Sequence, residues 1–267
     1  MSPRFARLIG IDYSGAQTAE SSLPGLRIYV APPGGMPAEV LPPESPRKYW
    51  TRRAIAEWLV TQLGTGGPML VGIDHAFSFP LRYFEAHGLK RDWVSFLDDF
   101  HRHWPTDVPH TWVDFVREGE CGNGAARMGN SRWRRLADER ARAKSVFHFD
   151  FPGSVAKSTH AGLPWLRYLR QQLGTRVHFW PFDGWTIPAG RSVIGEAYPS
   201  LWNRQVQPGT RTRDQHDAYC IAVSLARANR HGNLAAYFAP ELTAPERARA
   251  EVEGWILGLP ASGRAAN

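Results

Sequence analysis

Three short apolar runs of this sequence end in a carboxylate in nearly the same way. They are Ile9-Gly10-Ile11-Asp12, Val71-Gly72-Ile73-Asp74 and Val193-Ile194-Gly195-Glu196. Such runs are typical of buried strands, and in an α/β protein the carboxyl ends of the strands form the functional edge of the sheet. One acid at such a position is usually a turn residue. Three in one chain predict that Asp12, Asp74 and Glu196 meet at one edge.

Two more carboxylates lie in the first turn of a helix predicted from about Arg213 to Asn229. Asp214 precedes Ala218 by four residues, and Asp217 precedes Ile221 by four. Both acids therefore continue the apolar helix face that must pack on the sheet. The alternative is an N-terminal cap or an acid that complements the helix dipole, and it explains Asp214 better than Asp217.

Four or five carboxylates at one point cannot all stay ionised in a partly buried site unless cations compensate them. Oxygen ligands without cysteine, and with histidine only as a neighbour, favour Mg²⁺ or Mn²⁺ over zinc. Two such ions would bind the attacking water and the leaving oxygen of a phosphodiester. The predicted chemistry is therefore metal-dependent hydrolysis.

The elements that must position these acids follow from the apolar pattern. Strands are predicted at about 8–12, 27–31, 69–74, 176–180 and 191–196. Helices are predicted at 51–63, 164–173 and 213–229, and an amphipathic stretch at 244–257. The segment from about 81 to 160 is rich in Trp, His and Arg, and we expect it to be a mostly helical insertion. The chain is thus predicted to be one α/β domain over 1–267, with a mixed central β-sheet flanked by helices.

Composition sets the outer limits of the interpretation. A chain of 267 residues with 43% hydrophobic residues and 11 Trp is not a disordered protein. No apolar run approaches the roughly 18 residues of a membrane helix, and no secretory core is present, so a cytoplasmic protein is expected. The net charge is +7, and only four of the 32 basic residues are lysine. Arginine suits phosphate and favours a nucleic-acid or nucleotide partner, although an arginine-rich genome explains the composition equally well.

A family resemblance rests on the placement of four acids: Asp12 on the first strand, Asp74 on the strand after the first helix, and Asp214 and Asp217 on the last helix. This arrangement resembles the RNase H-like nuclease superfamily, nearest to the Holliday-junction resolvases. Within it, the chain is similar to an uncharacterised family of predicted RNase H-like nucleases, a domain of unknown function. The shared runs are Glu196-Ala197-Tyr198-Pro199 and Glu253-Gly254-Trp255-Ile256.

The resemblance implies an RNase H-like mixed sheet and a nuclease that hydrolyses DNA or RNA by a two-metal mechanism. It implies Asp12 as the ligand that bridges two metal ions, with Asp74 and Asp217 each holding one. Glu196 is expected as a fourth metal ligand, and Glu196 or Asp214 as the residue that orients water, because the superfamily varies at this position. The helical insertion departs from the minimal resolvase pattern, so the resemblance does not define the substrate.

Candidate substrate contacts lie in the predicted insertion. A helix is expected from Ser131 to Ser145, and its cations would follow a phosphate backbone, with Arg132, Arg135 and Arg142 as the proposed contacts. A solvated surface helix with internal Arg–acid pairs explains this pattern equally well. Lys157 lies in a polar stretch, 153–162, that we expect to be a loop; it would bind phosphate or simply cap the helix that follows.

Two other functions remain open from the sequence. The run Asp12-Tyr13-Ser14-Gly15 resembles the phosphate loop of actin-like ATPases and sugar kinases, but no second loop of this type follows Asp74. A non-catalytic protein with the same fold would bind nucleic acid or a partner through its basic surface. Intact carboxylates argue against this alternative, because an unused acidic cluster destabilises a fold by repulsion.

Overall fold

The structure is a computed structural model, and it describes residues 5–32, 35–43 and 48–262. Within these ranges the chain forms a mixed six-stranded sheet in the order β3-β2-β1-β4-β6-β5. The strands are β1 (Arg7–Tyr13), β2 (Leu26–Ala31), β3 (Ala38–Glu39), β4 (Met69–Asp74), β5 (Val177–Trp180) and β6 (Ser192–Glu196). The five predicted strands are confirmed, and the short edge strand β3 is an addition.

Strands β1, β4, β6 and β5 are parallel, whereas β2 runs antiparallel to β1 and β3 antiparallel to β2. The carboxyl ends of the four parallel strands therefore share one edge of the sheet. Asp12 at the end of β1 lies directly beside Asp74 at the end of β4 in this register. The sequence prediction of an α/β protein with a mixed sheet flanked by helices is confirmed at this level.

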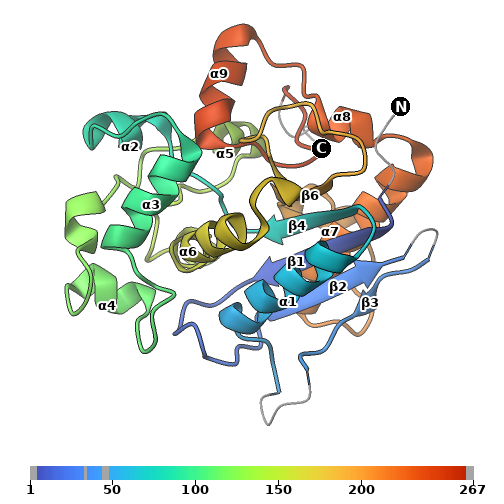
Figure 1. The fold of residues 1–267 in the computed structure, drawn as a ribbon, viewed down its shortest axis with the longest axis horizontal. Coiled ribbons are helices and arrows are strands. Elements are labelled where there is room, and N and C mark those ends of the chain that lie inside the picture. The colour runs from blue at the N-terminus through green and yellow to red at the C-terminus, as the bar shows by residue number, and fades with distance from the viewer. Residues whose placement is uncertain (1–4, 33–34, 44–47, 263–267) are drawn as a thin grey trace.

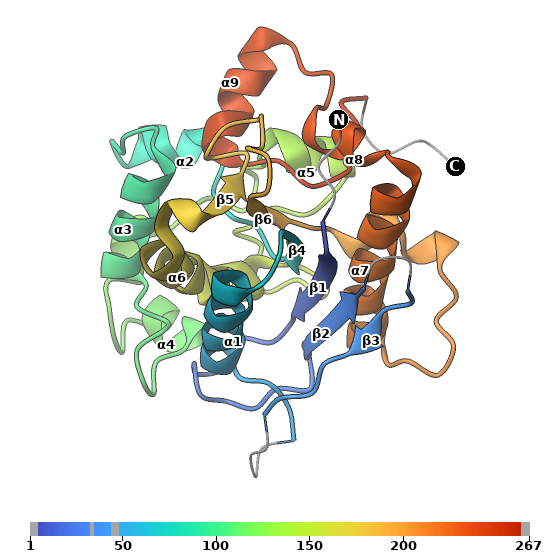
Figure 2. The same ribbon diagram turned by 45° about the vertical axis from the view of Figure 1, so that its right-hand side comes forward.

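Helices cover both faces of the sheet. The helices α1 (Arg52–Thr65) and α6 (Ala156–Leu173) lie on one face, and α7 (Arg213–His231) lies on the other (Figures 1 and 2). Helix α1 follows its N-terminal cap Thr51, whose side chain accepts a hydrogen bond from the Ala54 N–H. Helix α7 is capped by Thr212 and ends at Gly232, which adopts the left-handed conformation with φ of 74°.

Two glycines of a row across the sheet, Gly10 and Gly72, let α7 approach it closely. Gly10, Gly72 and Gly195 are neighbours in the register of β1, β4 and β6. A Cβ at Gly10 would lie 2.2 Å from the carbonyl oxygen of Ala218 on α7, and one at Gly72 would lie 2.7 Å from Ile221. Because alternate residues of a strand face the same side, the side chains of Asp12 and Asp74, two residues after these glycines, also face α7.

The segment between β4 and α6 is helical, in short pieces. Its helices are α2 (Leu81–Ala86), α3 (Trp93–His103), α4 (Val113–Glu118), the 3₁₀ turn η1 (Gly124–Arg127) and α5 (Leu136–Ala141). The predicted helix from Ser131 to Ser145 is wrong, because only α5 forms there. The residues from Ser131 to Arg135 are not helical, and α5 ends at Arg142, which adopts the left-handed conformation with φ of 55°.

The start of α6 is a second correction. Pro164 was expected to open this helix, but α6 begins at Ala156 and contains Pro164 within it. Lys157 therefore lies in the first turn of a helix and not in a loop. Ala156, Thr159, His160 and Leu163 are fully buried, so packing of this face extends the helix upstream of the proline.

The chain after α7 packs against the end of β6. Helices α8 (Leu234–Phe238) and α9 (Ala244–Glu253) lead to the buried residues Trp255 and Ile256, and Ile256 bridges to Glu196. Gly254, with φ of 83°, ends α9 before the predicted boundary at 257. The remaining 3₁₀ turns are η2 (Gly174–Arg176), η3 (Pro199–Leu201) and η4 (Asn203–Gln205). In the described ranges no helix combines the length and the apolarity that crossing a membrane requires.

Candidate functional site

Asp12 is the most buried acid of the strand-end group, with 1% of its surface exposed. Its Oδ1 atom accepts hydrogen bonds from the backbone N–H of Ser14 at 3.2 Å and from the Ser14 hydroxyl at 2.8 Å. Its Oδ2 atom is also buried and has no hydrogen-bond partner among the described residues. Burying a carboxylate oxygen without a hydrogen-bond donor costs free energy of folding. The Asp12 Oδ2 atom therefore calls for a partner that the described side chains do not supply.

The loop after Asp12 is fixed by a buried arginine. Arg52, the first residue of α1, is fully buried and donates hydrogen bonds to the carbonyl oxygens of Gly15 and Gln17. Its guanidinium also lies 5.3 Å from the centre of the Tyr13 ring. These contacts hold the turn in which Ser14 orients the Asp12 carboxylate.

Helix α7 brings Asp214 and Asp217 to the same edge, because it packs along β1 and β2 and begins near the strand ends (Figure 2). Both acids are close enough for their charges to raise the pKa of Asp12, and Asp217 also raises the pKa of Asp74. An arginine accompanies them: Arg213 Nε lies 3.9 Å from Asp217 Oδ2, and 83% of the arginine side chain is exposed. Four of the predicted acids, Asp12, Asp74, Asp214 and Asp217, thus lie near enough for their charges to interact.

Burial dominates the acid–base behaviour of this group. Desolvation raises the pKa of Asp12 and of Asp74 well above the usual aspartate range, and repulsion between the acids raises both further. The pKa of Asp217 is raised as well, mainly by burial. The ionised form of the group is therefore unfavourable on its own, and a bound cation would favour it.

Glu196 has a different role in the structure. It lies beside Ile73 in the register, one residue after Gly195, so its side chain faces the side of the sheet opposite to α7. Both carboxylate oxygens accept hydrogen bonds from the Arg135 guanidinium at 2.7 Å, and Oε2 also accepts from the Phe77 N–H. Burial raises the pKa of Glu196, while Arg135 opposes this effect. The charge of Glu196 helps to raise the pKa of Asp74, but both Glu196 oxygens are already hydrogen-bonded to Arg135.

The predicted phosphate contacts separate into three environments. Arg135 is 1% exposed, and its donors bind Asp138, Glu196 and the Glu253 carbonyl. A buried arginine with its donors engaged is a structural residue and not a surface contact for phosphate. Arg132 and Arg142 are exposed, and Arg132 lines a groove beside α2 and α9. Lys157 is paired with Asp114 at 2.7 Å.

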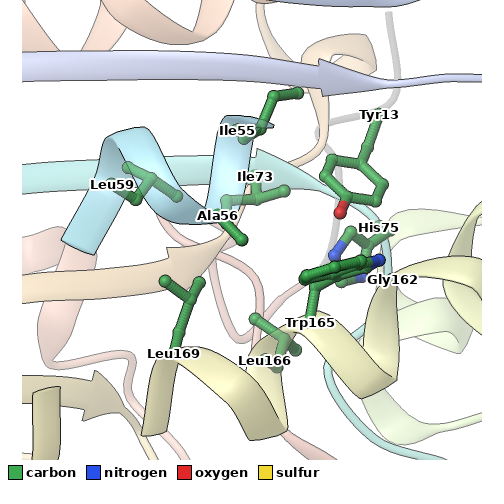
Figure 3. Close-up of a pocket in the computed structure, with 10 residues that line it drawn as sticks. All are labelled: Tyr13, Ile55, Ala56, Leu59, Ile73, His75, Gly162, Trp165, Leu166 and Leu169. Carbon is green, nitrogen blue, oxygen red and sulfur yellow. The ribbon is translucent and has the colours of Figure 1, made fainter. Parts of the chain in front are cut away.

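On the opposite face of the sheet, Tyr13 and His75 contribute to a mainly apolar pocket between α1 and α6 (Figure 3). The ring of His75 lies 4.8 Å from that of Tyr13, and its Nδ1 is within 2.9 Å of the Ala76 carbonyl oxygen. Burial lowers the pKa of His75 to about 4, so the imidazole is neutral at physiological pH. With Leu59 and Leu166 among the lining residues, this pocket belongs to the core beneath the acids.

The sequence analysis did not single out Ser14 and Arg213 as neighbours of these acids, and it expected Arg135 to contact phosphate and not to pair with Glu196. A signal for Ser14 was present, because a hydroxyl two residues after a strand-end aspartate is a common partner for it. A signal for Glu196 was also present. The acid follows its glycine directly in Gly195-Glu196, whereas Asp12 and Asp74 follow theirs after one residue, so the third acid belongs to the other face.

The acids whose charges act on one another are Asp12, Asp74 and Asp217, and Asp214 acts on Asp12 as well. The buried Oδ2 atom of Asp12 and the acids linked to it fit a divalent cation chemically, because all donors are carboxylate oxygens. Within the described part of the chain, no three or more His, Cys, Asp or Glu side chains are already arranged so as to hold a metal. Binding would therefore require the carboxylates to draw together.

Comparison with protein-family models gives no match, and comparisons with the curated proteins and with the solved structures give no match either. The function is therefore inferred from the residues of the site and their geometry.

Proposed function

We propose that the chain is a metal-dependent nuclease with an RNase H-like fold that hydrolyses phosphodiester bonds in DNA or RNA. The observation that carries the proposal is the Asp12 carboxylate, which is buried, has no donor to Oδ2 among the described residues and is near enough to Asp74, Asp214 and Asp217 for their charges to interact. Burying several like charges without a cation opposes folding. Retaining them at the open end of a parallel sheet is understandable if a divalent cation normally compensates them.

The RNase H-like part of the proposal is supported by the sheet and by where its acids lie. On one side of β1 lies the antiparallel β2, followed by β3, which is antiparallel to β2; on the other side lies the parallel β4. The acids lie on β1, on β4 and on the last sheet-packing helix, α7. Strand β5, at the far edge, and the helical segment before α6 are additions to this arrangement.

Asp12, Asp74 and Asp217 would hold Mg²⁺ or Mn²⁺. When bound, these ions polarise a phosphodiester and lower the pKa of water, which is the chemistry that hydrolysis requires. Ser14 holds the Asp12 carboxylate in one orientation. Asp214 is the acid that would orient the attacking water, because both oxygens of Glu196 are engaged by Arg135. Arg213, exposed beside Asp217, would contact the phosphate.

The test is a cleavage assay on labelled single-stranded, duplex and branched DNA and RNA, in Mg²⁺, in Mn²⁺ and in EDTA. We expect cleavage only with metal, and a loss of orders of magnitude in Asp12→Asn and Asp217→Asn. Asp98→Asn is the matched control, since Asp98 is an exposed acid of α3 paired with Arg167. Absence of cleavage on every substrate, or full activity of Asp12→Asn, would contradict the proposal.

A further inference from the structure

A second pocket opens next to the acids at the carboxyl edge of the sheet. It measures about 380 Å³ including its open mouth. Its walls come from the ends of β4 and β6, from α5 and from the loop before α6. Asp74 and Glu196 line it from the sheet, Lys144 and Gly153 from the loops, and Tyr198 from the chain after β6. A molecule held in this pocket would therefore contact Asp74 directly.

The charged groups of the pocket leave one cation for a ligand. Arg135 lines the pocket, but it is occupied by Glu196 and Asp138, which it compensates in turn. Lys144 has no carboxylate partner among the described residues. Its Nζ atom donates a hydrogen bond to the Pro152 carbonyl oxygen at 2.7 Å, and an ammonium group has further protons to donate.

Lys144 is held against an exposed aromatic ring. Its Nζ atom lies 3.7 Å from the centre of the Phe151 ring, and 48% of Phe151 is exposed. The His148 ring lies 5.1 Å from the same ring. The loop that carries Phe151 is braced by the neighbouring pair Asp150–Arg117, whose two hydrogen bonds are both 2.6 Å. The Lys144 ammonium lies over one face of this partly exposed ring, so stacking against a planar ligand would use the other face.

We propose that Phe151 and Lys144 form a nucleotide subsite in which the ring stacks on an unpaired base and the ammonium contacts a phosphate. Bases in a duplex have both faces covered, so only a strand that is single-stranded at this point can use the ring. The substrate is then a nucleic acid with unpaired nucleotides next to the bond at Asp74. This inference rests on the proposed nuclease function and adds the class of substrate to it.

The experiment measures binding of fluorescent 12-nucleotide single strands, DNA and RNA, and of a duplex of the same sequence, by anisotropy in EDTA. We expect the intact protein to bind the single strand more tightly. Phe151→Ala should weaken single-strand binding by about tenfold and leave duplex binding unchanged. Phe151→Trp, which retains an aromatic ring, should bind the single strand as tightly as the parent. Lys144→Gln should reduce the slope of log binding constant against log salt by about one unit.

Two matched controls remove similar groups elsewhere. Val108→Ala truncates an apolar side chain that is 44% exposed, and Lys90→Gln removes a charge from another exposed loop; both should bind like the parent. Equal losses on single strand and duplex in Phe151→Ala, no loss in that variant, or tighter binding of duplex by the parent would overturn the subsite.

Metal-dependent cleavage of the same strands separates this inference from the proposed function. Cleavage with metal but binding that is indifferent to Phe151 overturns the subsite and leaves the nuclease standing. Binding that depends on Phe151, with no cleavage in any metal, overturns the nuclease and supports the subsite.

Discussion

Replacing Asp12 by Asn tests the account through stability, independently of any substrate. Asparagine keeps the shape of the side chain, and its Oδ1 atom can still accept both hydrogen bonds from Ser14. The amide takes the place of the buried Oδ2 atom, which has no partner among the described residues. The change therefore removes one negative charge next to Asp74, Asp214 and Asp217 while preserving the local geometry.

The expected effects have opposite signs with and without metal. In EDTA at pH 7.5 the variant should melt at or above the parent, because repulsion within the buried group is reduced. At a metal concentration 100 times the dissociation constant, binding stabilises the parent by about 2.7 kcal/mol. For a domain of this size, that is an upward shift of about 5–10 °C. Asp12→Asn should show little of this shift.

The assay is thermal unfolding followed by circular dichroism, with EDTA, Mg²⁺ or Mn²⁺. Asp98→Asn serves as the control and should shift with metal as the parent does. A variant that melts well below the parent in EDTA would refute the claim that the Asp12 charge is uncompensated. An equal metal-induced shift in Asp12→Asn and the parent would refute its role as a ligand.

Three further predictions concern charge and packing. Burial raises the pKa of Asp12, so ionisation of this carboxyl opposes folding above about pH 4. In urea titrations with EDTA, the free energy of unfolding of Asp12→Asn relative to the parent should therefore rise from pH 4 to pH 8. A difference that does not depend on pH would contradict this. Arg135→Met leaves the buried carboxylates of Asp138 and Glu196 without their cation and should cost about 3–5 kcal/mol in urea unfolding. The double variant Arg135→Met/Glu196→Gln should recover part of this loss, and no recovery would refute the pairing. Gly10→Ala forces a methyl group against α7 and should cost about 3 kcal/mol. At Gly67 the added Cβ would make an ordinary contact, 3.5 Å from the Ala6 Cβ, so Gly67→Ala should be nearly neutral. Equal costs for the two variants would contradict the close approach of α7.

The strands and the acids on them could be predicted because the deciding interactions are local. Apolar runs bounded by turn residues mark β1 and β4, and the shared spacing from glycine to aspartate places Asp12 and Asp74 side by side. The four-residue spacing on α7 predicts that Asp214 and Asp217 continue the face toward the sheet. These inferences need only the period of a strand or a helix.

Glu196 could not be placed by similarity of its run to the other two. Strand pairing fixes which residues are neighbours, and a one-residue offset from the aligned glycine reverses the face of the sheet. Its partner, Arg135, is 61 residues away in the sequence, so the ion pair arises only from tertiary packing. The same pairing removes Arg135 from the surface on which it was expected.

Helix boundaries between β4 and β5 were also set by tertiary contacts. The charged stretch from 131 to 145 has helix-forming residues, but the buried Arg135 and Ser145 anchor its two ends, and only six residues remain helical. The predicted helix starts at Pro164, and proline is common in the first turn of a helix. In α6 the buried side chains upstream of it outweigh that local preference.

The most direct test of the central claim is a crystal structure of the protein soaked in Mn²⁺, with data collected at a wavelength where manganese scatters anomalously. We expect an anomalous peak within ligand distance, about 2.0–2.3 Å, of carboxylate oxygens of Asp12, Asp74 and Asp217, and no peak at these positions in Asp12→Asn. A map without manganese between these side chains, at a Mn²⁺ concentration that occupies sites elsewhere on the molecule, would contradict it.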